Sequence, residues 1–352
     1  GAGAQTSPDF ELQQPQDNMS VTAGETLTLT CTMSRSSLPG PVKWLKGWGS
    51  GNETVYDQTG DFPHVTRIVS DSNTDFSIRI KDVRPEDAGT YYCVKFHKSV
   101  GGLDVFRRGK GTVVSVHAKP TPPVVSGPDQ RTGLGQLVPF TCTAGGFFPK
   151  EVDVKWFKEK ARISGQQPQY EAVIPVPPPN ITLGQTKSSY NVASTVTVML
   201  QKNDVRSQLV CEVGHSTLTT PLRGRYQLGK ALRVSPEVNV VTDLLSPLEG
   251  NRTMNFTCHV KGFYPGNVSV TWLENGTEIK VENTSQPVET PEGLFTLRSL
   301  LEVQATEEKN GSVFTCRVVH DAQDPISRTA TLSISVPDRQ GPSDRPQTDN
   351  GA

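Results

Sequence analysis

Three cysteine pairs, each with a tryptophan at nearly the same position inside it, limit most strongly what this chain can fold into. The six cysteines of the 352-residue sequence form successive pairs with separations of 62, 69 and 58 residues. In each pair a tryptophan follows the first cysteine by 13 or 14 residues. The triplets are Cys31, Trp44 and Cys93; Cys142, Trp156 and Cys211; and Cys258, Trp272 and Cys316. This recurrence predicts three similar modules in a row, and the chain length suits three domains of about 100 residues.

Each repeat indicates a sandwich of two β-sheets of the immunoglobulin type. In that fold strands B and F carry the two cysteines and face each other across the sheets, while the indole of strand C packs on their disulfide. Six cysteines allow many pairings, so a bridge within each repeat is inferred from the spacing. Leu27, Leu29 and Cys31 alternate with threonines, which is the period of a strand with one buried face. We therefore expect an all-β fold of three tandem immunoglobulin-like β-sandwiches, each with one B–F disulfide.

The cysteines and the N-glycosylation sequons together predict an extracellular protein. Disulfides persist in oxidising compartments, and the sequence has no C-x-x-C pair with metal-ligand spacing. Six of nine Asn-x-Ser/Thr sequons lie after residue 250, which predicts a third domain shielded by sugar. The sequence shows neither a secretory leader nor an apolar run of membrane-spanning length, so we expect a processed ectodomain whose full-length form is anchored through another segment. The sequon asparagines are Asn18, Asn52, Asn180, Asn251, Asn255, Asn267, Asn275, Asn283 and Asn310.

Proline-rich segments divide the chain. Lys119-Pro120-Thr121-Pro122-Pro123 separates the first two modules, and a segment ending at Pro236 begins the third. Proline stiffens such joints, so we expect a semi-rigid rod. The predicted limits are 7–118, 119–231 and 232–336 for the three domains, and 337–352 for a disordered membrane-proximal stalk with almost no apolar residue.

The first domain differs in type from the other two. Tyr91 lies two residues before Cys93, as in the tyrosine corner of variable-type domains, and the stretch before it leaves room for a C′ strand and a C″ strand. The second and third domains share a C-x-V-x-H pattern that ends at His215 and His320, and Gly-Phe-Phe-Pro or Gly-Phe-Tyr-Pro follows their first cysteines. These features indicate one variable-type domain followed by two constant-type domains.

That layout resembles the signal-regulatory protein family of leukocyte receptors, and the resemblance covers nearly the whole folded chain. It implies that the first domain binds a protein counter-receptor on another cell, often the integrin-associated "self" protein, and so regulates leukocyte activation, phagocytosis or adhesion. The strings that carry the resemblance include Val42-Lys43-Trp44-Leu45-Lys46-Gly47, Tyr91-Tyr92-Cys93-Val94-Lys95-Phe96, Lys155-Trp156-Phe157-Lys158, Pro221-Leu222-Arg223-Gly224 and Thr271-Trp272-Leu273-Glu274-Asn275-Gly276.

The resemblance also places the ligand at the far end of the first domain, on the B–C, C′–D, D–E and F–G loops. Lys95 and Phe96 match the family directly, whereas residues 99–104 lack the acidic cluster that several members use. His97 and Lys98 make this end more basic than in those members. Because an encounter between like charges is costly, the family's usual ligand cannot be assumed for this chain. Phe62 and Leu103 are the candidate apolar anchors. The predicted ligand-binding residues are Ser36, Ser37, Leu38, Pro39, Gln58, Thr59, Asp61, Phe62, Ser72, Asn73, Lys95, His97, Lys98, Leu103 and Asp104.

Other classes of function have less support. The six histidines are scattered, and the glycine-rich segment 47–51 has no helix signature after it, so we expect neither an enzyme nor a small-molecule substrate, cofactor or metal. A formal net charge of -1 gives no signal for nucleic acid. An immunoglobulin-superfamily adhesion molecule, or an antigen-receptor-like chain in a heterodimer, is the alternative. Arg108 stands where antigen receptors have an aromatic residue in strand G, and burying an unpaired arginine would disfavour that side-by-side pairing.

Overall fold

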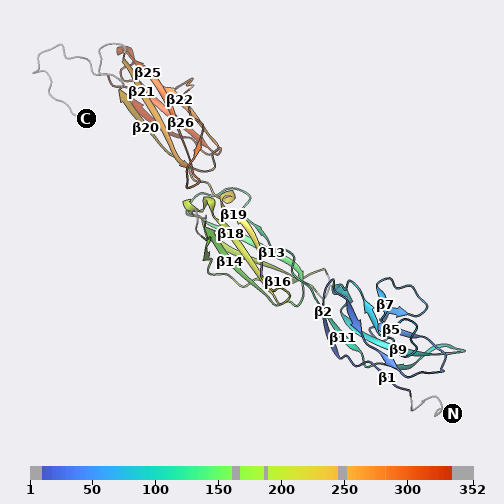
Figure 1. Ribbon diagram of the computed structural model, residues 1–352. Coiled ribbons are helices and arrows are strands. Elements are labelled where there is room, and N and C mark those ends of the chain that lie inside the picture. Colours follow the sequence, from blue (N-terminus) through green and yellow to red (C-terminus); the bar gives the residue numbers. More distant parts are fainter. Residues whose placement is uncertain (1–9, 161–166, 186–188, 245–251, 282, 335–352) are drawn as a thin grey trace, which may run out of the picture.

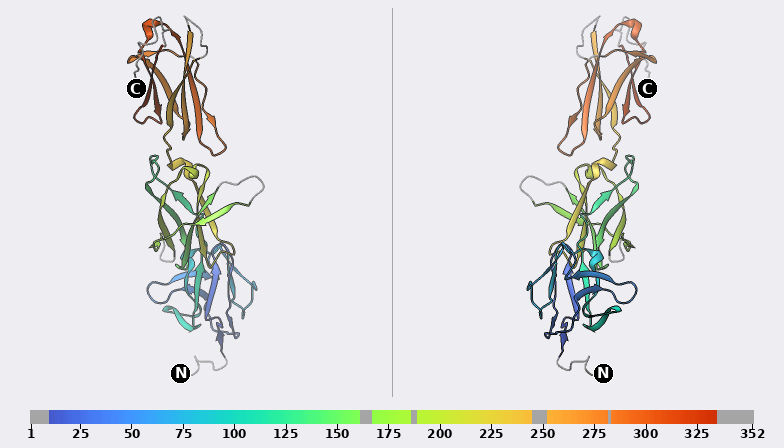
Figure 2. Two further views of the ribbon diagram at one scale, coloured as in Figure 1. Left: turned by 90° about the vertical axis from the view of Figure 1, so that its left-hand side faces the viewer. Right: turned by 90° about the vertical axis from the view of Figure 1, so that its right-hand side faces the viewer.

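The chain forms three β-sandwiches that follow one another in an extended row (Figure 1). The computed structural model describes residues 10–160, 167–185, 189–244, 252–281 and 283–334. The row stays extended in two views turned by 90° (Figure 2). The predicted fold class is confirmed. The exact domain limits stay a prediction, and the predicted stalk lies outside the described residues.

Domain 1 is a variable-type sandwich. One sheet has the order β2-β11-β9-β5-β6, with β10 paired to β9, and the other has the order β3-β8-β7, while β1 pairs with β4. Strand β6 is the expected C′ strand, and the described chain continues from it to β7 without a C″ strand. The elements are β1 (Leu12–Gln13), β2 (Asn18–Thr22), β3 (Leu27–Leu29), β4 (Thr32–Met33), β5 (Val42–Lys46), β6 (Glu53–Asp57), β7 (Val65–Arg67), β8 (Ile78–Ile80), the 3-10 helix η2 (Pro85–Asp87), β9 (Gly89–Ser99), β10 (Gly102–Arg108) and β11 (Thr112–His117).

The core of domain 1 is built around the Cys31–Cys93 disulfide. The indole of Trp44 is fully buried beside it and donates its Nε1–H to the carbonyl of Phe76 at 2.8 Å, so the one polar atom of the ring is satisfied. The Tyr91 hydroxyl donates to the carbonyl of Asp87 at 2.5 Å, which confirms the predicted tyrosine corner. Burial raises the pKa of Tyr91 far above its usual value.

Domains 2 and 3 are constant-type sandwiches of two four-stranded sheets each. Domain 2 has the sheets β12-β13-β17-β16 and β15-β14-β18-β19, and domain 3 has β20-β21-β25-β24 and β23-β22-β26-β27. The elements of domain 2 are β12 (Val124–Ser126), β13 (Leu137–Phe147), β14 (Val152–Lys160), β15 (Gln169–Ala172), β16 (Asn180–Leu183), β17 (Tyr190–Met199), η3 (Lys202–Arg206), β18 (Gln208–His215), β19 (Leu222–Gln227) and η4 (Leu228–Ala231). Those of domain 3 are β20 (Glu237–Leu244), β21 (Arg252–Phe263), β22 (Val268–Glu274), β23 (Thr277–Ile279), β24 (Val288–Glu289), β25 (Phe295–Ala305), η5 (Glu307–Lys309), β26 (Val313–His320) and β27 (Ile326–Thr331).

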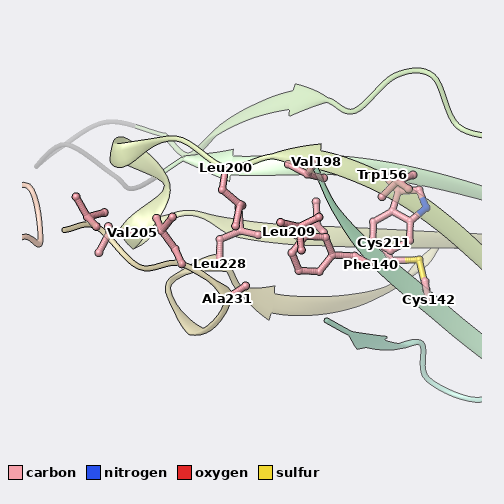
Figure 3. Packing of buried hydrophobic residues seen from close by; sticks show 14 of the residues in the cluster. Phe140, Cys142, Trp156, Val198, Leu200, Val205, Leu209, Cys211, Leu228 and Ala231 are labelled. Atoms are coloured by element: carbon pink, nitrogen blue, oxygen red, sulfur yellow. A yellow bond between two sulfur atoms is a disulfide. The ribbon is translucent and has the colours of Figure 1, made fainter. Parts of the chain in front are cut away.

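The two constant-type cores use the same arrangement of side chains. In domain 2 the disulfide Cys142–Cys211 lies beside the buried indole of Trp156 (Figure 3). Trp156 donates its Nε1–H to the hydroxyl of Ser194 at 2.9 Å, and in domain 3 Trp272 makes the same bond to Ser299 at 2.8 Å. The third disulfide is Cys258–Cys316, so all three predicted pairings are confirmed.

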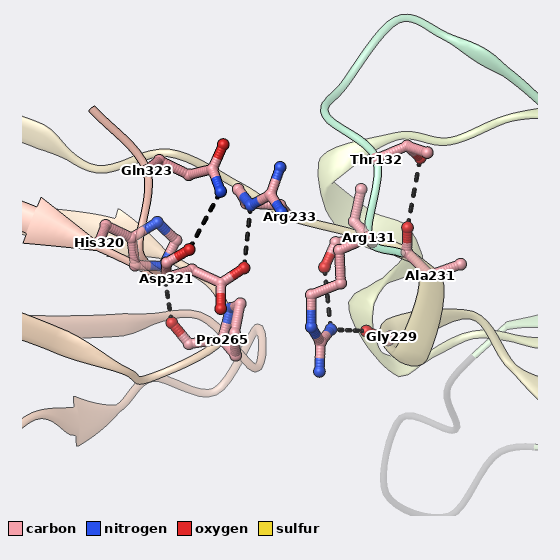
Figure 4. Close-up of polar contacts among 10 residues, drawn as sticks. Arg131, Thr132, Gly229, Ala231, Arg233, Pro265, His320, Asp321 and Gln323 are labelled. Atoms are coloured by element: carbon pink, nitrogen blue, oxygen red, sulfur yellow. Dashed lines mark hydrogen bonds and ion pairs between the residues drawn. The ribbon is translucent and has the colours of Figure 1, made fainter. Parts of the chain in front are cut away.

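Domain 3 packs directly on domain 2 at their joint (Figure 4). Arg233 donates from Nε to the Asp321 carboxylate at 2.9 Å. Arg131 donates to the carbonyls of Gly229 and Leu232, and its guanidinium lies 5.4 Å from the ring centre of Tyr264. These contacts tie the end of domain 2 and the segment after it to two loops of domain 3, the one between β21 and β22 and the one after β26.

Candidate functional site

The loops of domain 1 that were predicted to bind a ligand lie at the end of the rod away from domain 2. Strand β11 leads into domain 2, whereas the β9–β10 hairpin extends toward the opposite end of domain 1 (Figure 1). We call the B–C loop (34–41), the residues 58–59 after β6, the D–E loop (68–77) and the β9–β10 hairpin together the tip. Each part of the tip is held by side chains or backbone groups of the sandwich beneath it.

Lys95 holds the B–C loop in place. Its side chain is buried, and its ammonium donates to the carbonyl of Leu38 at 3.1 Å and to that of Gly40 at 2.6 Å. Burial lowers the pKa of Lys95. The backbone N–H groups of Phe96 and Lys98 donate to the carbonyls of Pro41 and Pro39. A predicted contact residue is therefore a support for the loop, with its charge facing inward.

Gly40 allows this close approach of the loop to β9. Its φ is +141°, and a Cβ atom at this position would lie 2.0 Å from the carbonyl oxygen of Phe96. No side chain fits there without moving the backbone.

Arg67 holds the D–E loop. Its Nη2 donates to the carbonyls of Ser72 and Asp75, at 2.6 and 2.5 Å, and the guanidinium stacks 4.3 Å from the ring centre of Phe76. The Ser72 hydroxyl accepts the N–H of Asp75 at 2.9 Å, so it stabilises the turn. Sequence reasoning missed Arg67, because a strand arginine carries no signal that its guanidinium caps a neighbouring loop.

A cavity of about 510 Å³ opens between these loops. It brings together residues from separate parts of the chain: the B–C loop, Gln58 after the C′ strand, Asn73 of the D–E loop and the Lys95 side chain. The described residues that line it include Arg35 and Lys95 and no carboxylate. Because the Lys95 ammonium already donates to loop carbonyls, Arg35 and the hydroxyl and amide groups are the donors that favour acceptor-rich or negatively charged groups of a partner. The lining residues are Met33, Ser34, Arg35, Ser36, Ser37, Gly40, Val42, Gln58, Asn73, Phe76 and Lys95.

The β9–β10 hairpin projects beside this cavity. Its register places Lys98 opposite Leu103 and His97 opposite Asp104, with Val100 and Gly101 in the turn. Leu103 and Val105 are exposed, and Val100 is fully exposed. The hairpin therefore presents an apolar edge with one lysine, formed by Leu103, Val105 and, in the turn, Val100.

Some predicted residues do not line the cavity. Phe62 is half-buried and packs on Tyr56, with ring centres 6.1 Å apart. It lines a second cavity, lower on the domain, together with Lys46 and Arg84. Thr59 and Asp61 are exposed on the same connection. The structure thus places Leu103, and not Phe62, where an apolar anchor at the tip would be.

Arg108 lies on the open face of the larger sheet. Its guanidinium stacks on Trp48 at 4.7 Å and on Tyr92 at 5.1 Å from the ring centres, and the side chain stays exposed. This cation–π stack covers the rings of Trp48 and Tyr92 on that face, and the expectation about side-by-side pairing stays a prediction.

Most sequon asparagines are accessible. Asn18, Asn52, Asn180, Asn267, Asn275, Asn283 and Asn310 are exposed, Asn255 is half-buried, and Asn251 lies outside the described residues. Asn255 lies on the outward face of its strand as expected, between Asp243 and Glu302, but its Oδ1 atom is covered. Attachment of sugar at these positions stays a prediction.

Comparisons with known proteins agree with the domain types. An immunoglobulin V-set domain matches residues 13–117, and immunoglobulin C1-set domains match residues 124–218 and 238–323. Human signal-regulatory protein beta-1 is 38% identical over 97% of this chain and 84% of its own length. This chain belongs to the signal-regulatory protein family. Bovine tyrosine-protein phosphatase non-receptor type substrate 1, a second relative, is 42% identical over 95% of the chain.

This signal-regulatory protein spans about two thirds, 65%, of that bovine relative. In the fold alone it is similar to the mouse nectin-like molecule 4 ectodomain, with a TM-score of 0.50 at 16% identity, over 92% of this chain and 98% of that one. The immunoglobulin domains and the family of this chain indicate that it is a receptor with an extracellular or cell-surface location. No helix within the described ranges is long and apolar enough to cross a membrane.

Proposed function

We propose that this chain is the ligand-binding ectodomain of an immune cell-surface receptor, which binds a protein counter-receptor on an opposing cell through the tip of domain 1. The observation that carries the proposal is the cavity that joins Ser36, Ser37, Gln58, Asn73 and Lys95. They come from four separate segments of the chain, and the resemblance to the family predicts each of them as a ligand contact. Binding would regulate leukocyte activation, phagocytosis or adhesion, without catalysis.

The held loops support a binding role. Lys95 and Arg67 fix the backbones on two sides of the cavity, so little conformational entropy is lost when a partner docks. The cavity supplies donors, and the adjacent hairpin supplies the apolar side chains of Leu103 and Val105. A polar pocket beside an apolar edge matches a partner with an acceptor-rich or acidic loop. Integrin-associated protein of the same species is the first ligand to test.

Surface plasmon resonance on the whole ectodomain tests the site. Lys98→Glu should lower the association rate several-fold and weaken its salt dependence, because long-range attraction acts on encounter. Leu103→Ala should mainly raise the dissociation rate, since it removes a contact that forms only in the complex. Arg317→Glu, an exposed position in domain 3, is the control and should bind as the wild type does. Undiminished binding by a chain that lacks residues 1–118 would refute the proposal.

An adhesion role is the competing function, and the exposed edge of the hairpin is the feature that favours it. An adhesion molecule of this kind would bind a second copy of domain 1 on an opposing cell. Beads coated with the chain would then aggregate with one another. A receptor for a different protein predicts no such aggregation, and it predicts binding to cells that carry the counter-receptor.

A further inference from the structure

Domains 2 and 3 each bury a histidine beside a joint. The Nε2 atoms of His215 and His320 lie 2.7 and 2.8 Å from the carbonyl oxygen of the proline in Gly-Phe-Phe-Pro and in Gly-Phe-Tyr-Pro. The residue before that proline, Phe148 or Tyr264, forms the backbone bridge of the joint. Each histidine ring also contacts a phenylalanine, with ring centres 5.4 Å apart. Since a carbonyl oxygen only accepts hydrogen bonds, the neutral ring carries its hydrogen on Nε2 in both domains.

The second ring nitrogen distinguishes the two histidines. The Nδ1 atom of His215 lies 2.7 Å from the hydroxyl of Thr217, which can donate to the neutral ring and accept from the protonated one. The Nδ1 atom of His320 is covered and has no hydrogen-bond partner in the part of the chain that the structure describes. Two residues after His320 stands Ala322, which has no hydroxyl. A proton on His320 would therefore create a buried N–H donor without an acceptor, which is a costly state.

Three charged groups act on the His320 ring, and they come from three elements (Figure 4). Asp321 belongs to the turn after β26, Arg233 to the segment between the domains, and Arg131 to domain 2. Burial lowers the pKa of His320, the hydrogen bond to Pro265 and the charge of Asp321 act to raise it, and the two arginines act to lower it. Asp321 already accepts from Nε of Arg233 at 2.9 Å. A protonated His320 therefore competes with Arg233 for the Asp321 carboxylate.

Arg233 is the residue through which this competition reaches the joint. Its backbone N–H donates to the Thr132 carbonyl of domain 2 at 2.8 Å, and its side chain pairs with Asp321 of domain 3. The turn that carries Asp321 is strained, because Asp321 and Ala322 are consecutive non-glycine residues with φ of 48° and 55°. Such a backbone persists only where the surrounding contacts hold it. Loss of the contact with Arg233 thus lets the turn relax and removes one of the ties between the domains.

We propose that the joint between domains 2 and 3 is an acid-sensitive switch, in which a proton on His320 releases the turn 321–323 from Arg233 and loosens the orientation of domain 3. The buried contact of Leu294 with the core of domain 2 does not depend on pH, so it stays as the pivot. The first joint lacks the switch, because His215 has a partner in both protonation states. A cell-surface receptor meets acid of roughly pH 5 to 6 after uptake into endosomes. The inference depends on that location and not on the ligand of the tip.

Pulsed dipolar spectroscopy on the whole ectodomain tests the switch. Spin labels on cysteines introduced at Lys155 and Ser327, both exposed, report the distance between domains 2 and 3. From pH 7.4 to pH 5.0 the width of the distance distribution should rise about two-fold, because a buried histidine takes up a proton in this range. The midpoint of the change should lie below about pH 6.5, the ordinary pKa of histidine. His320→Gln does not titrate and should keep the narrow distribution at both pH values.

Two further variants keep the test decisive if His320→Gln does not fold. His215→Gln is the matched control and should leave the acid response of the second joint unchanged. Arg233→Gln removes the contact that acid breaks, so its distribution should be broad at pH 7.4 and change little on acidification. The proposal is overturned if the wild-type width is equal at both pH values, if His320→Gln still broadens, or if the midpoint lies near about pH 4, where carboxylates titrate. Loss of the near-ultraviolet circular dichroism in step with the broadening also overturns it, because domain 3 would then be unfolding.

Discussion

The two joints of the rod begin with the same backbone bridge and differ in what surrounds it. At the first joint Ala118 and Phe148 exchange two backbone hydrogen bonds, both of 3.0 Å. At the second, Val234 and Tyr264 exchange two of 2.8 and 3.0 Å. The aromatic partners are the equivalent residues of Gly-Phe-Phe-Pro and Gly-Phe-Tyr-Pro.

The second joint adds contacts beyond the bridge. It has the Arg233–Asp321 ion pair, the stack of Arg131 on Tyr264, and Leu294 of domain 3, which is buried in the core cluster of domain 2. Beside the first bridge the described contacts include the rings of His117 and Phe148, 6.4 Å apart. The Thr121 N–H donates to the Gly145 carbonyl, and the Gly145 N–H donates to the Thr121 hydroxyl. A shared core couples two domains energetically, whereas a backbone bridge only aligns them. Domains 2 and 3 should therefore behave as one unit that carries domain 1 on a more pliable connection.

The largest expected effect comes from Leu294→Ala. Truncating a buried leucine costs roughly 2–5 kcal/mol, and here it should lower the unfolding temperatures of domains 2 and 3 together, because one domain supplies the residue and the other its surroundings. Differential scanning calorimetry measures both transitions. Leu297→Ala lies in the core of domain 3 itself and should lower the transition of that domain alone. If both variants lowered the same transitions, Leu294 would not couple domains 2 and 3, and the proposed difference between the joints would be wrong.

A smaller effect is expected from Asp321→Asn. The Arg233 and Asp321 side chains are 19% and 21% exposed, so loss of the charge should weaken the attachment of the joint segment, which carries Arg233, to the body of domain 3 by about 1–2 kcal/mol. Glu289→Gln breaks the more exposed pair with Arg206 at the same joint and should cost about 0.5 kcal/mol or less. Denaturant unfolding measures the loss in each variant, and a cycle of Asp321→Asn with Arg233→Gln gives the interaction energy of that pair. A larger loss for Glu289→Gln would contradict the assignment.

Lowering the pH should reduce the stability of domain 3 through protonation of His320, by less than the substitutions above. Burial lowers the pKa of His320, whose Nε2 lies 2.8 Å from the Pro265 carbonyl and whose Nδ1 has no hydrogen-bond partner among the described residues. Asp321 acts to raise this pKa, and Arg233 and Arg131 act to lower it. In the unfolded chain His320 takes up a proton near pH 6.5, whereas in the folded chain it does so only at lower pH. The stabilisation of domain 3 by neutral His320 is therefore full above pH 6.5 and decreases as the pH falls below that value. His320→Gln should flatten the pH dependence of domain 3 unfolding, and an unchanged slope would exclude His320 as its source.

The last prediction concerns how widely the orientation of neighbouring domains varies, and it involves hardly any change in the free energy of unfolding. Spin labels on domains 1 and 2 should give a broader distance distribution than labels at matched positions on domains 2 and 3, since no core cluster of the described residues spans the first joint. Pulsed dipolar spectroscopy measures both. In Leu294→Ala the second distribution should widen toward the first. Two equally narrow distributions in the wild type would show that the backbone bridge and the prolines alone are stiff enough.

Much of the framework followed from the sequence because it depends on spacing and period. The Cys–Trp–Cys repeats determine which strands face each other, and Asn275-Gly276 predicts the tight turn that joins β22 to β23, where both residues have positive φ. The family resemblance selected the loops that line the cavity. What each side chain does there depends on contacts across the fold. Lys95, which the sequence predicts as a ligand contact, also holds the B–C loop through its ammonium, and Phe62, which it predicts as an anchor, packs on Tyr56.

The outward face of the β12-β13-β17-β16 sheet in domain 2, whose strands contain no charged residue, shows the opposite case, in which the sequence held the information but no local pattern drew attention to it. Threonine, valine and leucine in alternation predict an ordinary strand with one buried face. Only the register of β12, β13 and β17 shows that their outward residues form one uncharged surface. The contacts of Leu294 and Arg233 across the second joint were likewise invisible, because they depend on how two domains pack.

Gly40 limits which positions of the tip can be substituted to change its ligand. The neighbouring positions Ser36, Ser37 and Pro39 are exposed and tolerate randomisation, whereas a library that also varies Gly40 would consist mostly of clones with a displaced B–C loop. Insertions next to it would draw the Leu38 and Gly40 carbonyls away from the Lys95 ammonium and leave that charge buried alone. Affinity selection from this scaffold should therefore yield binders that differ in side chains on an unchanged loop backbone, and sequencing the selected pools would find glycine at position 40 throughout.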